Sequence, residues 1–512
     1  MFKNKIAVML SLLLSFAVTA EENVLPEKDI LKVNAAADNG QNGTLRWALE
    51  KNNQNPGRYK IEIDFKDNAP LVIKPGKPLP EIKGPVDIIN MNWLREGTYI
   101  AIDGSGYIKP VDPRSCPGAE KGQYGANVRT NTLPGLVLRD THDVTIQGLE
   151  VRNFCIGILL NRASNNVIED NRFVANHGGA GLMMTGDDGK GNSTATTTQR
   201  NKILRNTFLN NGDGMEATRG ASFNLIADNL ITTDASNQEP SQGLEMLWGN
   251  DNQVIHNTFQ NYSDGVQINW GNRNYIAANM FKNLSSAVTL SGTDNIVAGN
   301  RMVNNRVAVA VRPQGVAGKD GRFGINRITG PNRDRISENI MIDNGKDIKR
   351  CFAGGSCLPD YAGAIVFNVP GLEHADFPGS RGGGISNNAS TLERICALDG
   401  NSAGCEKTPN ENQLPPVISQ AAHQGNDLIV SGSVKGEANT LYRIEFFANS
   451  KANRDEAENF LGYDMVPVHA DGQGTFKYIL PLTDDIVVAN VTSTATTEDG
   501  ATSPLSKPVT AK

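Results

Sequence analysis

Two glutamates occupy equivalent places in two consecutive copies of a short repeat. Glu216 lies in Gly214-Met-Glu-Ala-Thr-Arg219, and Glu245 lies in Gly243-Leu-Glu-Met-Leu-Trp248. Strands of neighbouring coils in a stacked sheet lie about 4.8 Å apart, so the two carboxylates are expected to be neighbours. Like charges at that separation repel, which raises the proton affinity of one carboxyl group. Such a pair can divide into an acid and a base or nucleophile.

Residues suited to binding a sugar follow the glutamates on the same expected outer face. Trp248 and Trp270 close consecutive strands and would stack, and a flat indole is a platform for a sugar ring. Side chains able to bond hydroxyl groups or a carboxylate stand beside them: Gln267, Asn269, Thr218 and Arg219. Longer inserts at residues 186–193 and 232–242 flank the glutamates. Loops beside a rigid face commonly form the walls of a cleft.

Two further residues could take part in proton transfer. Asp213 directly precedes Gly214, and His177 lies in Asn-His-Gly-Gly, although both also fit ordinary turn positions. Together with Glu216 and Glu245, Asp213 could hold Ca²⁺. No metal site of the zinc type is indicated, because the sequence has no Cys-x-x-Cys and its six histidines are scattered. A solvated strand face carries the same kinds of polar residue, so plain surface is the alternative interpretation.

The elements that must position these residues are the coils of a solenoid. An asparagine recurs at positions 171, 206, 229, 257, 279 and 300, with the last two steps 22 and 21 residues long. A strand-like repeat near 22 residues indicates one coil per repeat. In each copy, the residue after the Gly or Ala and the residue two further on are apolar, which predicts an inward face. Each asparagine is expected to stack on its neighbour in the same turn.

This pattern resembles the right-handed parallel β-helix of the pectate-lyase-like superfamily, over about residues 30–400. The stretch from Asn39 to Leu49 is similar to the opening of many bacterial secreted β-helix proteins, and a helix beginning after Thr44 is expected to cover the N-terminal end. The resemblance implies an all-β fold but no reaction class. The superfamily's ordered motif sets are absent, as is the Asp-Pro-His-Asp of alginate-type epimerases, and Asp187-Asp188 stands alone.

The two ends of the chain have other signatures. Residues 1–20 read as a signal peptide, with Lys3 and Lys5 before an apolar run and Val18-Thr19-Ala20 at the cleavage site. We therefore expect an exported protein, with the β-helix over residues 21–400, a linker over 401–416 and an immunoglobulin-like antiparallel β-sandwich over 417–512. No other stretch is long and apolar enough to span a membrane.

Six cysteines and the charge balance complete the sequence-based predictions. An even cysteine count in an exported chain favours disulfides, of which Cys351–Cys357, Cys396–Cys405 and Cys116–Cys155 are the natural pairs among fifteen formal pairings. The formal net charge of −6 does not suggest a nucleic-acid partner. Nothing in the sequence sets an oligomeric state.

Three hypotheses from different classes follow. The first is a secreted polysaccharide-active protein, a glycoside hydrolase with Glu216 and Glu245 as its carboxylate pair. The second is a non-enzymatic surface or matrix protein, with the solenoid as a stalk and the sandwich as an adhesion module. The third is a polysaccharide lyase or epimerase with His177 or an arginine as base and with Ca²⁺ held by the acidic residues.

Overall fold

The computed structural model describes most of the chain from residue 28 onward. The described residues are 28–66, 71–108, 133–177, 179–186, 197–234, 237, 241–312, 314–316, 327–330, 332–345, 363–367, 409–452, 454–483 and 485–512. The expected signal peptide, five of the six cysteines, residues 187–193 of the first predicted insert and residues 235, 236 and 238–240 of the second lie outside the described residues. Cys155 is described, buried and disulfide-bonded. Within the described part, no helix is long and apolar enough to cross a membrane.

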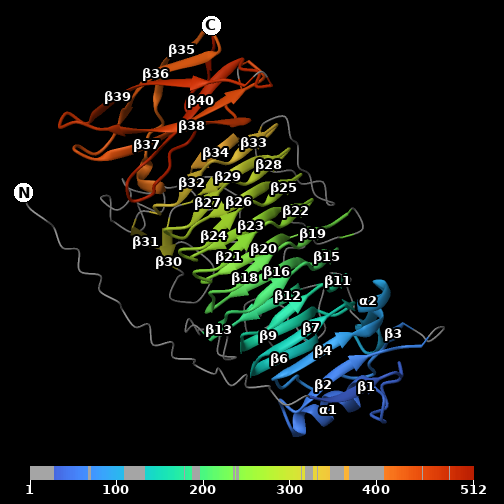
Figure 1. Ribbon diagram of the computed structural model, residues 1–512. Helices are drawn as coiled ribbons and strands as arrows, with labels where there is room; N and C mark the ends of the chain where they lie inside the picture. The colour runs from blue at the N-terminus through green and yellow to red at the C-terminus, as the bar shows by residue number, and fades with distance from the viewer. Residues whose placement is uncertain are drawn as a thin grey trace, which may run out of the picture.

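Three long parallel sheets wind into a right-handed β-helix, as predicted (Figure 1). The first sheet contains, in spatial order, β1 (Asp29–Val33), β2 (Tyr59–Ile63), β4 (Val86–Asn90), β7 (Val144–Gln147), β10 (Val167–Glu169), β14 (Lys202–Leu204), β18 (Leu225–Ala227), β21 (Gln253–Ile255), β24 (Tyr275–Ala277), β27 (Ile296–Ala298) and β32 (Arg335–Ser337). The second contains β3 (Val72–Ile73), β5 (Ile100–Asp103), β8 (Leu149–Arg152), β11 (Arg172–Val174), β15 (Thr207–Leu209), β19 (Leu230–Thr232), β22 (Thr258–Gln260), β25 (Met280–Lys282), β28 (Arg301–Val303) and β33 (Ile340–Ile342).

The third sheet carries the residues singled out above. It contains β6 (Pro134–His142), β9 (Ile156–Ser164), β12 (Ala180–Thr185), β16 (Asp213–Thr218), β20 (Gln242–Leu247), β23 (Asp264–Asn269), β26 (Ser286–Leu290), β29 (Val307–Val311) and β34 (Gly363–Phe367). Two short pairs lie outside the three sheets: β13 (Thr198–Gln199) with β17 (Ala221–Ser222), and β30 (Gln314–Val316) with β31 (Arg327–Gly330). The register pairs Glu216 with Glu245 and Glu245 with Gln267, as the repeat predicts.

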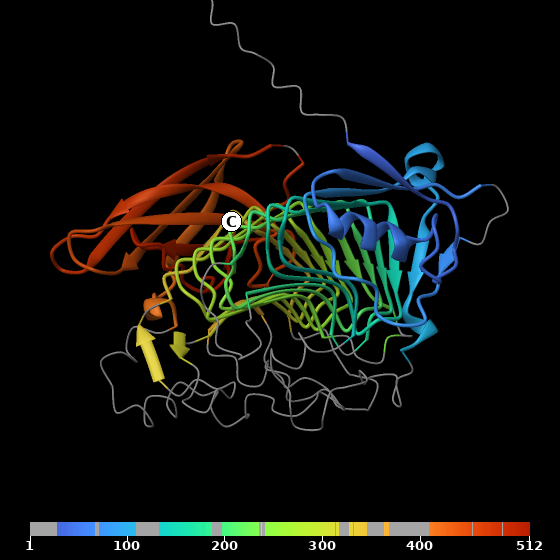
Figure 2. The ribbon, with the colours of Figure 1, turned by 90° about the horizontal axis from the view of Figure 1, so that it is seen from below.

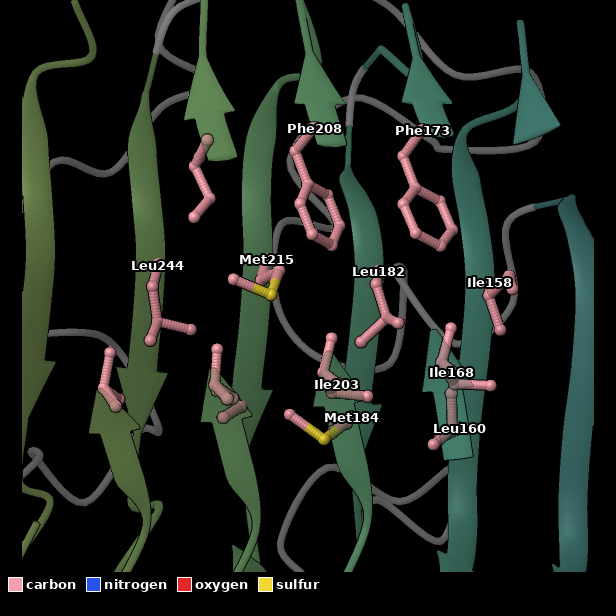
Figure 3. Packing of buried hydrophobic residues seen from close by; sticks show 14 of the residues in the cluster. Ile158, Leu160, Ile168, Phe173, Leu182, Met184, Ile203, Phe208, Met215 and Leu244 are labelled. Carbon is pink, nitrogen blue, oxygen red and sulfur yellow. The ribbon is translucent and has the colours of Figure 1, made fainter. Parts of the chain in front are cut away.

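Columns of like side chains fill the interior of the solenoid. Figure 3 shows Ile158, Leu182, Met215 and Leu244 in one column and Phe173 beside Phe208 in another. The two phenyl rings stack with centroids 4.6 Å apart. Burial of each such side chain contributes about 1.5–3 kcal/mol, so the repetition of apolar residues at one strand position stabilises coil upon coil.

Buried asparagines form hydrogen-bonded ladders at the turns between sheets. Asn171 donates from its backbone N–H to the side-chain oxygen of Asn206, 2.9 Å away, and the side-chain amide of Asn171 donates to the same oxygen at 3.2 Å. The same pattern continues through Asn229, Asn257, Asn279 and Asn300. The predicted stacking of the six asparagines in one turn is therefore confirmed.

The N-terminal end of the solenoid is covered by helix α1 (Leu45–Gln54), which Figure 2 shows beside the first coils. Thr44 caps the helix by accepting a hydrogen bond from the backbone N–H of Trp47, 3.3 Å away, as predicted. Leu45, Ala48 and Leu49 are buried in the solenoid core. Two further short helices occur in the described chain near this end, α2 (Met91–Glu96) and the 3-10 turn η1 (Gly104–Gly106).

Two antiparallel sheets at the C-terminus share one apolar cluster and form the predicted sandwich. One contains β35 (Val417–Gln424), β36 (Asp427–Lys435) and β39 (Gln473–Pro481); the other contains β38 (Asn459–Pro467), β37 (Leu441–Asn449), β40 (Asn490–Thr496) and β41 (Val509–Thr510). Its immunoglobulin-like kinship stays a prediction. The segment before it, read from sequence as linker, includes the turn η2 (Asn410–Asn412), in which Asn410 is fully buried and bonded to the solenoid.

Asp334 interrupts an asparagine ladder, and replacing it by asparagine is expected to stabilise the fold. Its Oδ1 accepts two hydrogen bonds from Asn295, but its Oδ2 is buried without a hydrogen-bond partner among the described residues. Burial above all raises the pKa of Asp334 well above its ordinary value near 3.8. An amide at this position could donate a hydrogen bond. We expect Asp334→Asn to raise the free energy of unfolding at pH 7 by about 1–3 kcal/mol, measured by urea denaturation.

The stability difference between Asp334→Asn and wild type depends on pH because the pKa of Asp334 is raised. Native Asp334 binds its proton more tightly than the unfolded chain does, so its contribution is fully present below pH 3.8 and is lost as pH rises toward the native pKa. The stability gap between Asp334→Asn and wild type should therefore widen from about pH 4 upward. The reverse change in a neighbouring ladder, Asn300→Asp, should destabilise the protein at pH 7. A gap independent of pH would contradict this account.

Candidate active site

The outer face of the third sheet is apolar at the early and late coils and polar at the coils between them. Apolar residues at its early coils form a cluster separate from the core, namely Ile156, Leu159, Ala180 and Met183, and a second such cluster at later coils contains Val307 and Ala310. At the equivalent positions of the intervening coils stand Asp213 with Glu216, and Asp264 with Gln267. These polar side chains therefore leave the sheet on the outer side. The predicted outward direction of the glutamates is confirmed.

Three carboxylates gather at this place. Asp213, Glu216 and Glu245 each contribute an oxygen such that the three oxygens lie within 4.8 Å of one another. Their exposed fractions are 3%, 1% and 5%, so the interpretation as plain solvated surface is wrong. Asp213 is the first residue of strand β16. It is therefore not only a turn residue, as its position before a glycine had suggested. Carboxylates held this close disfavour simultaneous ionisation, a condition under which one can act as an acid and another as a base.

A chain of buried polar contacts leads away from the carboxylates along the sheet. Asp213 accepts from the backbone N–H of Gln242 at 3.1 Å, and the amide of Gln242 donates to Gln267 at 3.3 Å. Gln267 in turn donates to Asp264 at 2.8 Å and accepts from Asn269 at 3.1 Å.

The far end of this chain is a buried cation. Arg312 donates to the side-chain oxygen of Asn269 at 2.7 Å and is 2% exposed. The sequence predicted Gln267 and Asn269 as binding residues but gave no role to Gln242 or Asp264. Their position directly before the strand glycine, where Asp213 also stands, is the signal that could have found them.

The predicted tryptophan pair exists, but it is less exposed than expected. The indoles of Trp248 and Trp270 stack with centroids 4.7 Å apart, and the guanidinium of Arg219 lies 5.1 Å from the centroid of Trp248. Trp270 is 6% exposed and Trp248 is half-buried, so the expectation of two exposed indoles is wrong. Both residues have positive φ, near 57°. Each lies in the turn directly after its strand of the third sheet, β20 or β23. That conformation is uncommon for bulky residues and fixes the direction of the rings.

Two further titratable residues belong to the coils on either side of Asp213. Burial lowers the pKa of His177, which precedes β12 in the coil before Asp213, so its imidazole is neutral and able to accept a proton at neutral pH. Tyr262 is buried and donates to the backbone carbonyl of Asn211. Burial, with the charge of Asp213 as a second cause, raises the pKa of Tyr262 well above its usual range. The phenol therefore stays protonated.

Comparisons with known proteins fit this architecture. A model of the family described as periplasmic copper-binding protein (NosD) matches residues 120–224. Among solved structures, a mutant of the periplasmic alginate epimerase AlgG is 11% identical with a TM-score of 0.32, covering 55% of this chain and 59% of its own. The DFA-IIIase from Arthrobacter chlorophenolicus A6 is 13% identical with a TM-score of 0.34, covering 60% of this chain and 65% of its own. At these levels the likenesses carry no argument about function.

Fold and site define a class: parallel β-helix proteins with a buried acidic site on the outer face of one sheet. A curated relative narrows the class. The 3-dehydroshikimate dehydratase of Acinetobacter baylyi (strain ATCC 33305 / BD413 / ADP1) is 50% identical over 474 residues, which cover 92% of this chain and 93% of that protein. The chain belongs to the same family as this Acinetobacter protein.

Proposed function

We propose that the chain is an exported dehydratase acting on 3-dehydroshikimate or a closely similar cyclic hydroxy-keto acid. The observation that carries the proposal is the 50% identity to the Acinetobacter 3-dehydroshikimate dehydratase, spread over nearly the full length of both chains. The coils that hold the carboxylates lie within the stretch of sequence that aligns with this relative. They are not part of a segment that the relative lacks.

The reaction class suits the site. In a β-hydroxy ketone, a base removes the proton from the carbon between the carbonyl and the hydroxyl-bearing carbon. The electron pair forms a carbon–carbon double bond, and the hydroxyl leaves with a proton from an acid, so that water is released without oxidation or reduction. Such an elimination needs one group that accepts a proton and one that donates a proton, both within hydrogen-bond reach of the substrate.

The carboxylates of Glu216 and Glu245 are our candidates for these two roles. They are paired across adjacent strands and held within 4.8 Å together with Asp213. His177, neutral because burial lowers its pKa, is the alternative base. Arg312 and Arg219 are candidates for binding the substrate carboxylate, because a guanidinium forms two parallel hydrogen bonds with a carboxylate.

A second candidate function is the action on a polysaccharide expected from the sequence, by hydrolysis, elimination or epimerisation. The stacked indoles of Trp248 and Trp270 favour it, since aromatic faces bind sugar rings. The burial of Trp270 and of the three carboxylates favours a small ligand instead, because small-molecule sites enclose most of the ligand surface.

One experiment separates the two candidates. The purified protein is incubated with 3-dehydroshikimate, and the product is followed by mass spectrometry as the loss of one water. Parallel reactions contain a panel of neutral and acidic polysaccharides and are read for new reducing ends and for unsaturated uronate. We expect turnover of the small acid alone. Release of oligosaccharides without dehydration would favour the second candidate.

Export is part of the proposal. The signal-peptide pattern of residues 1–20 and the match to the NosD family of periplasmic proteins both support a location outside the cytoplasm. The disulfide at Cys155 supports the same compartment, because disulfides persist in oxidising surroundings.

A further inference from the structure

We infer that Leu247, Thr218 and Arg312 hold the ring of the substrate, and that Arg312 binds its carboxylate and makes the site selective for cyclic acids. The inference rests on the proposed function and deepens it, because it assigns the residues that select the substrate. Leu247 and Thr218 are paired across the adjacent strands β20 and β16. Arg312 directly follows β29, which lies three strands beyond β20 in the same sheet.

Leu247 is an apolar residue in a polar column. Leu244 and Met246 belong to the core, so Leu247 leaves the sheet on the outer side. The residues paired in register on either side of it are all polar: Asn161, Thr185, Thr218 and Asn269. Leu247 is 4% exposed, yet it belongs to none of the apolar clusters that the described residues form. A single buried apolar side chain among polar ones is suited to contact the face of a ligand ring.

The hydroxyl of Thr218 lies one coil from Leu247 and has no hydrogen-bond partner among the described residues, although Thr218 is only 1% exposed. A buried hydroxyl of this kind costs free energy, which a polar group of a ligand would recover. Glu216 and Glu245 stand two residues before Thr218 and Leu247 on the same strands, and therefore on the same outer side. A ring that lies over Leu247 would have the Thr218 hydroxyl at one end and the two glutamates along one side.

The opposite end of the ring position is positively charged. Asn269 is paired with Leu247 in the register, and its Oδ1 accepts from Arg312 at 2.7 Å and from Ser291 at 3.4 Å. The side chain of Arg312 thus passes the coil of Ser291 and brings its guanidinium to the coil next to Leu247. Arg312 and Asn269 are 2% and 3% exposed, so the cation is held in one place and shielded from water. Such shielding strengthens its attraction for an anion.

Spacing and charge set the direction in which a cyclic acid would lie. Coils stack about 4.8 Å apart and residues two apart on one strand are about 7 Å apart, which places the guanidinium of Arg312 about 8–12 Å from the carboxylate of Glu245. One six-membered ring with its carboxylate fits this gap, with a hydrogen bond of about 3 Å at either end. The glutamates repel the substrate carboxylate and the guanidinium attracts it. The carboxylate would therefore face Arg312, and the carbon that loses its proton would face the glutamates.

Arg219 is less suited to binding the carboxylate. Its guanidinium lies 5.1 Å from the ring centroid of Trp248, which in turn stacks on Trp270. The cation of Arg219 is therefore positioned on an indole. It also follows Thr218 directly, at the end of the ring position opposite to Arg312. We assign the substrate carboxylate to Arg312 alone.

The first test compares an acid with its ester. The purified full chain and its variants are assayed with 3-dehydroshikimate and with the methyl ester of this acid, and the ratio of the two kcat/KM values is recorded. We expect wild type to prefer the acid. Arg312→Gln should lower the ratio by about 10–100-fold, the range for hydrogen bonds between charged groups, because only the acid loses a charged partner. The ratio does not depend on how much of a preparation is folded, so partial unfolding cannot imitate this result.

The other two residues should affect acid and ester alike. Leu247→Ala and Thr218→Val should each lower both kcat/KM values by about tenfold and leave their ratio unchanged, because each removes an uncharged contact. Thr218→Val should not lower the melting midpoint, since it removes a buried hydroxyl without a partner. Arg205→Gln, at the turn after β14, and Leu209→Ala, on the outer side of β15, are the matched controls and should behave like wild type.

Binding of shikimate provides a second test that needs no turnover. Shikimate keeps the ring and the carboxylate but lacks the ketone that makes the proton removable. Isothermal titration calorimetry should show that wild type binds shikimate more tightly than methyl shikimate. Arg312→Gln should bind shikimate at least about tenfold more weakly and lose this preference.

The outcomes distinguish this inference from the proposed function. Dehydration of 3-dehydroshikimate with an unchanged acid-to-ester ratio in Arg312→Gln would overturn the inference alone, as would a ratio that falls in Arg219→Gln instead. Shikimate binding that depends on Arg312, in a protein that does not dehydrate 3-dehydroshikimate, would overturn the proposed function and leave the binding site standing. Absence of both turnover and shikimate binding would overturn both.

Discussion

Glu216→Gln and Glu245→Gln are each expected to lower kcat for dehydration of 3-dehydroshikimate by about 10²–10⁴-fold, the range typical for removal of a general acid or base. The amide keeps the shape of the side chain but neither accepts nor donates the proton. Because both side chains are buried among like charges, neither change should reduce the thermal midpoint. Initial rates and melting curves of the same preparations measure the two effects together.

The pH profile separates the two glutamates. If one is the base and the other the acid, wild-type kcat/KM follows a bell-shaped curve, and each substitution removes one limb of it. Glu169→Gln serves as the control, because Glu169 pairs with Arg205 on another sheet and should leave the profile unchanged. Variants that retain wild-type rates would remove both glutamates from the proposed mechanism. Loss of activity in His177→Gln alone would transfer the role of base to the imidazole.

Much of the fold follows from the repeat itself. Side chains in a strand alternate between faces, so a column of apolar residues at one position of every coil fixes which face points inward. The buried asparagines mark the turns, since each must stack on an identical neighbour to satisfy its amide. The register of Glu216, Glu245 and Gln267 is therefore readable from spacing alone, and the structure has that register.

Which residues make up the site was harder to predict from the sequence than where the site lies in the fold. Strand alternation places Asp213 inward if it is counted from Met215, yet it faces outward with Glu216 because the glycine between them interrupts the alternation. The same break explains why the roles of Gln242 and Asp264 were missed. Burial of Glu216, Glu245 and Trp270 was also not predictable, because a repeat shows which way a side chain points and not what lies over it.

The C-terminal sandwich packs against the last coil of the solenoid. Phe447 and Ala457 belong to the apolar core cluster of the solenoid. The backbone of Ala457 exchanges two hydrogen bonds with Met341, of 2.8 and 3.3 Å. The sandwich therefore covers the last coil, which would otherwise expose core residues and unpaired strand edges.

Glu445 is the polar centre of this contact, and Glu445→Ala is expected to lower the free energy of unfolding by about 3–5 kcal/mol, as for other buried ion pairs broken on one side. Its carboxylate is fully buried, accepts from the hydroxyl of Ser337 and the backbone N–H of Glu338, and pairs with Arg443 at 2.8 Å. Alanine would leave all three donors without this acceptor.

Lys451→Ala provides the matched control at the same contact. Lys451 pairs with Asp343 on the solenoid, but both side chains are about half exposed, so this change should cost at most about 1 kcal/mol. Differential scanning calorimetry of the full chain distinguishes the two arrangements. If the sandwich is the cap, Glu445→Ala lowers the unfolding temperature of the solenoid together with that of the sandwich. If it were a separate module, the solenoid transition would stay in place and only a sandwich transition would move.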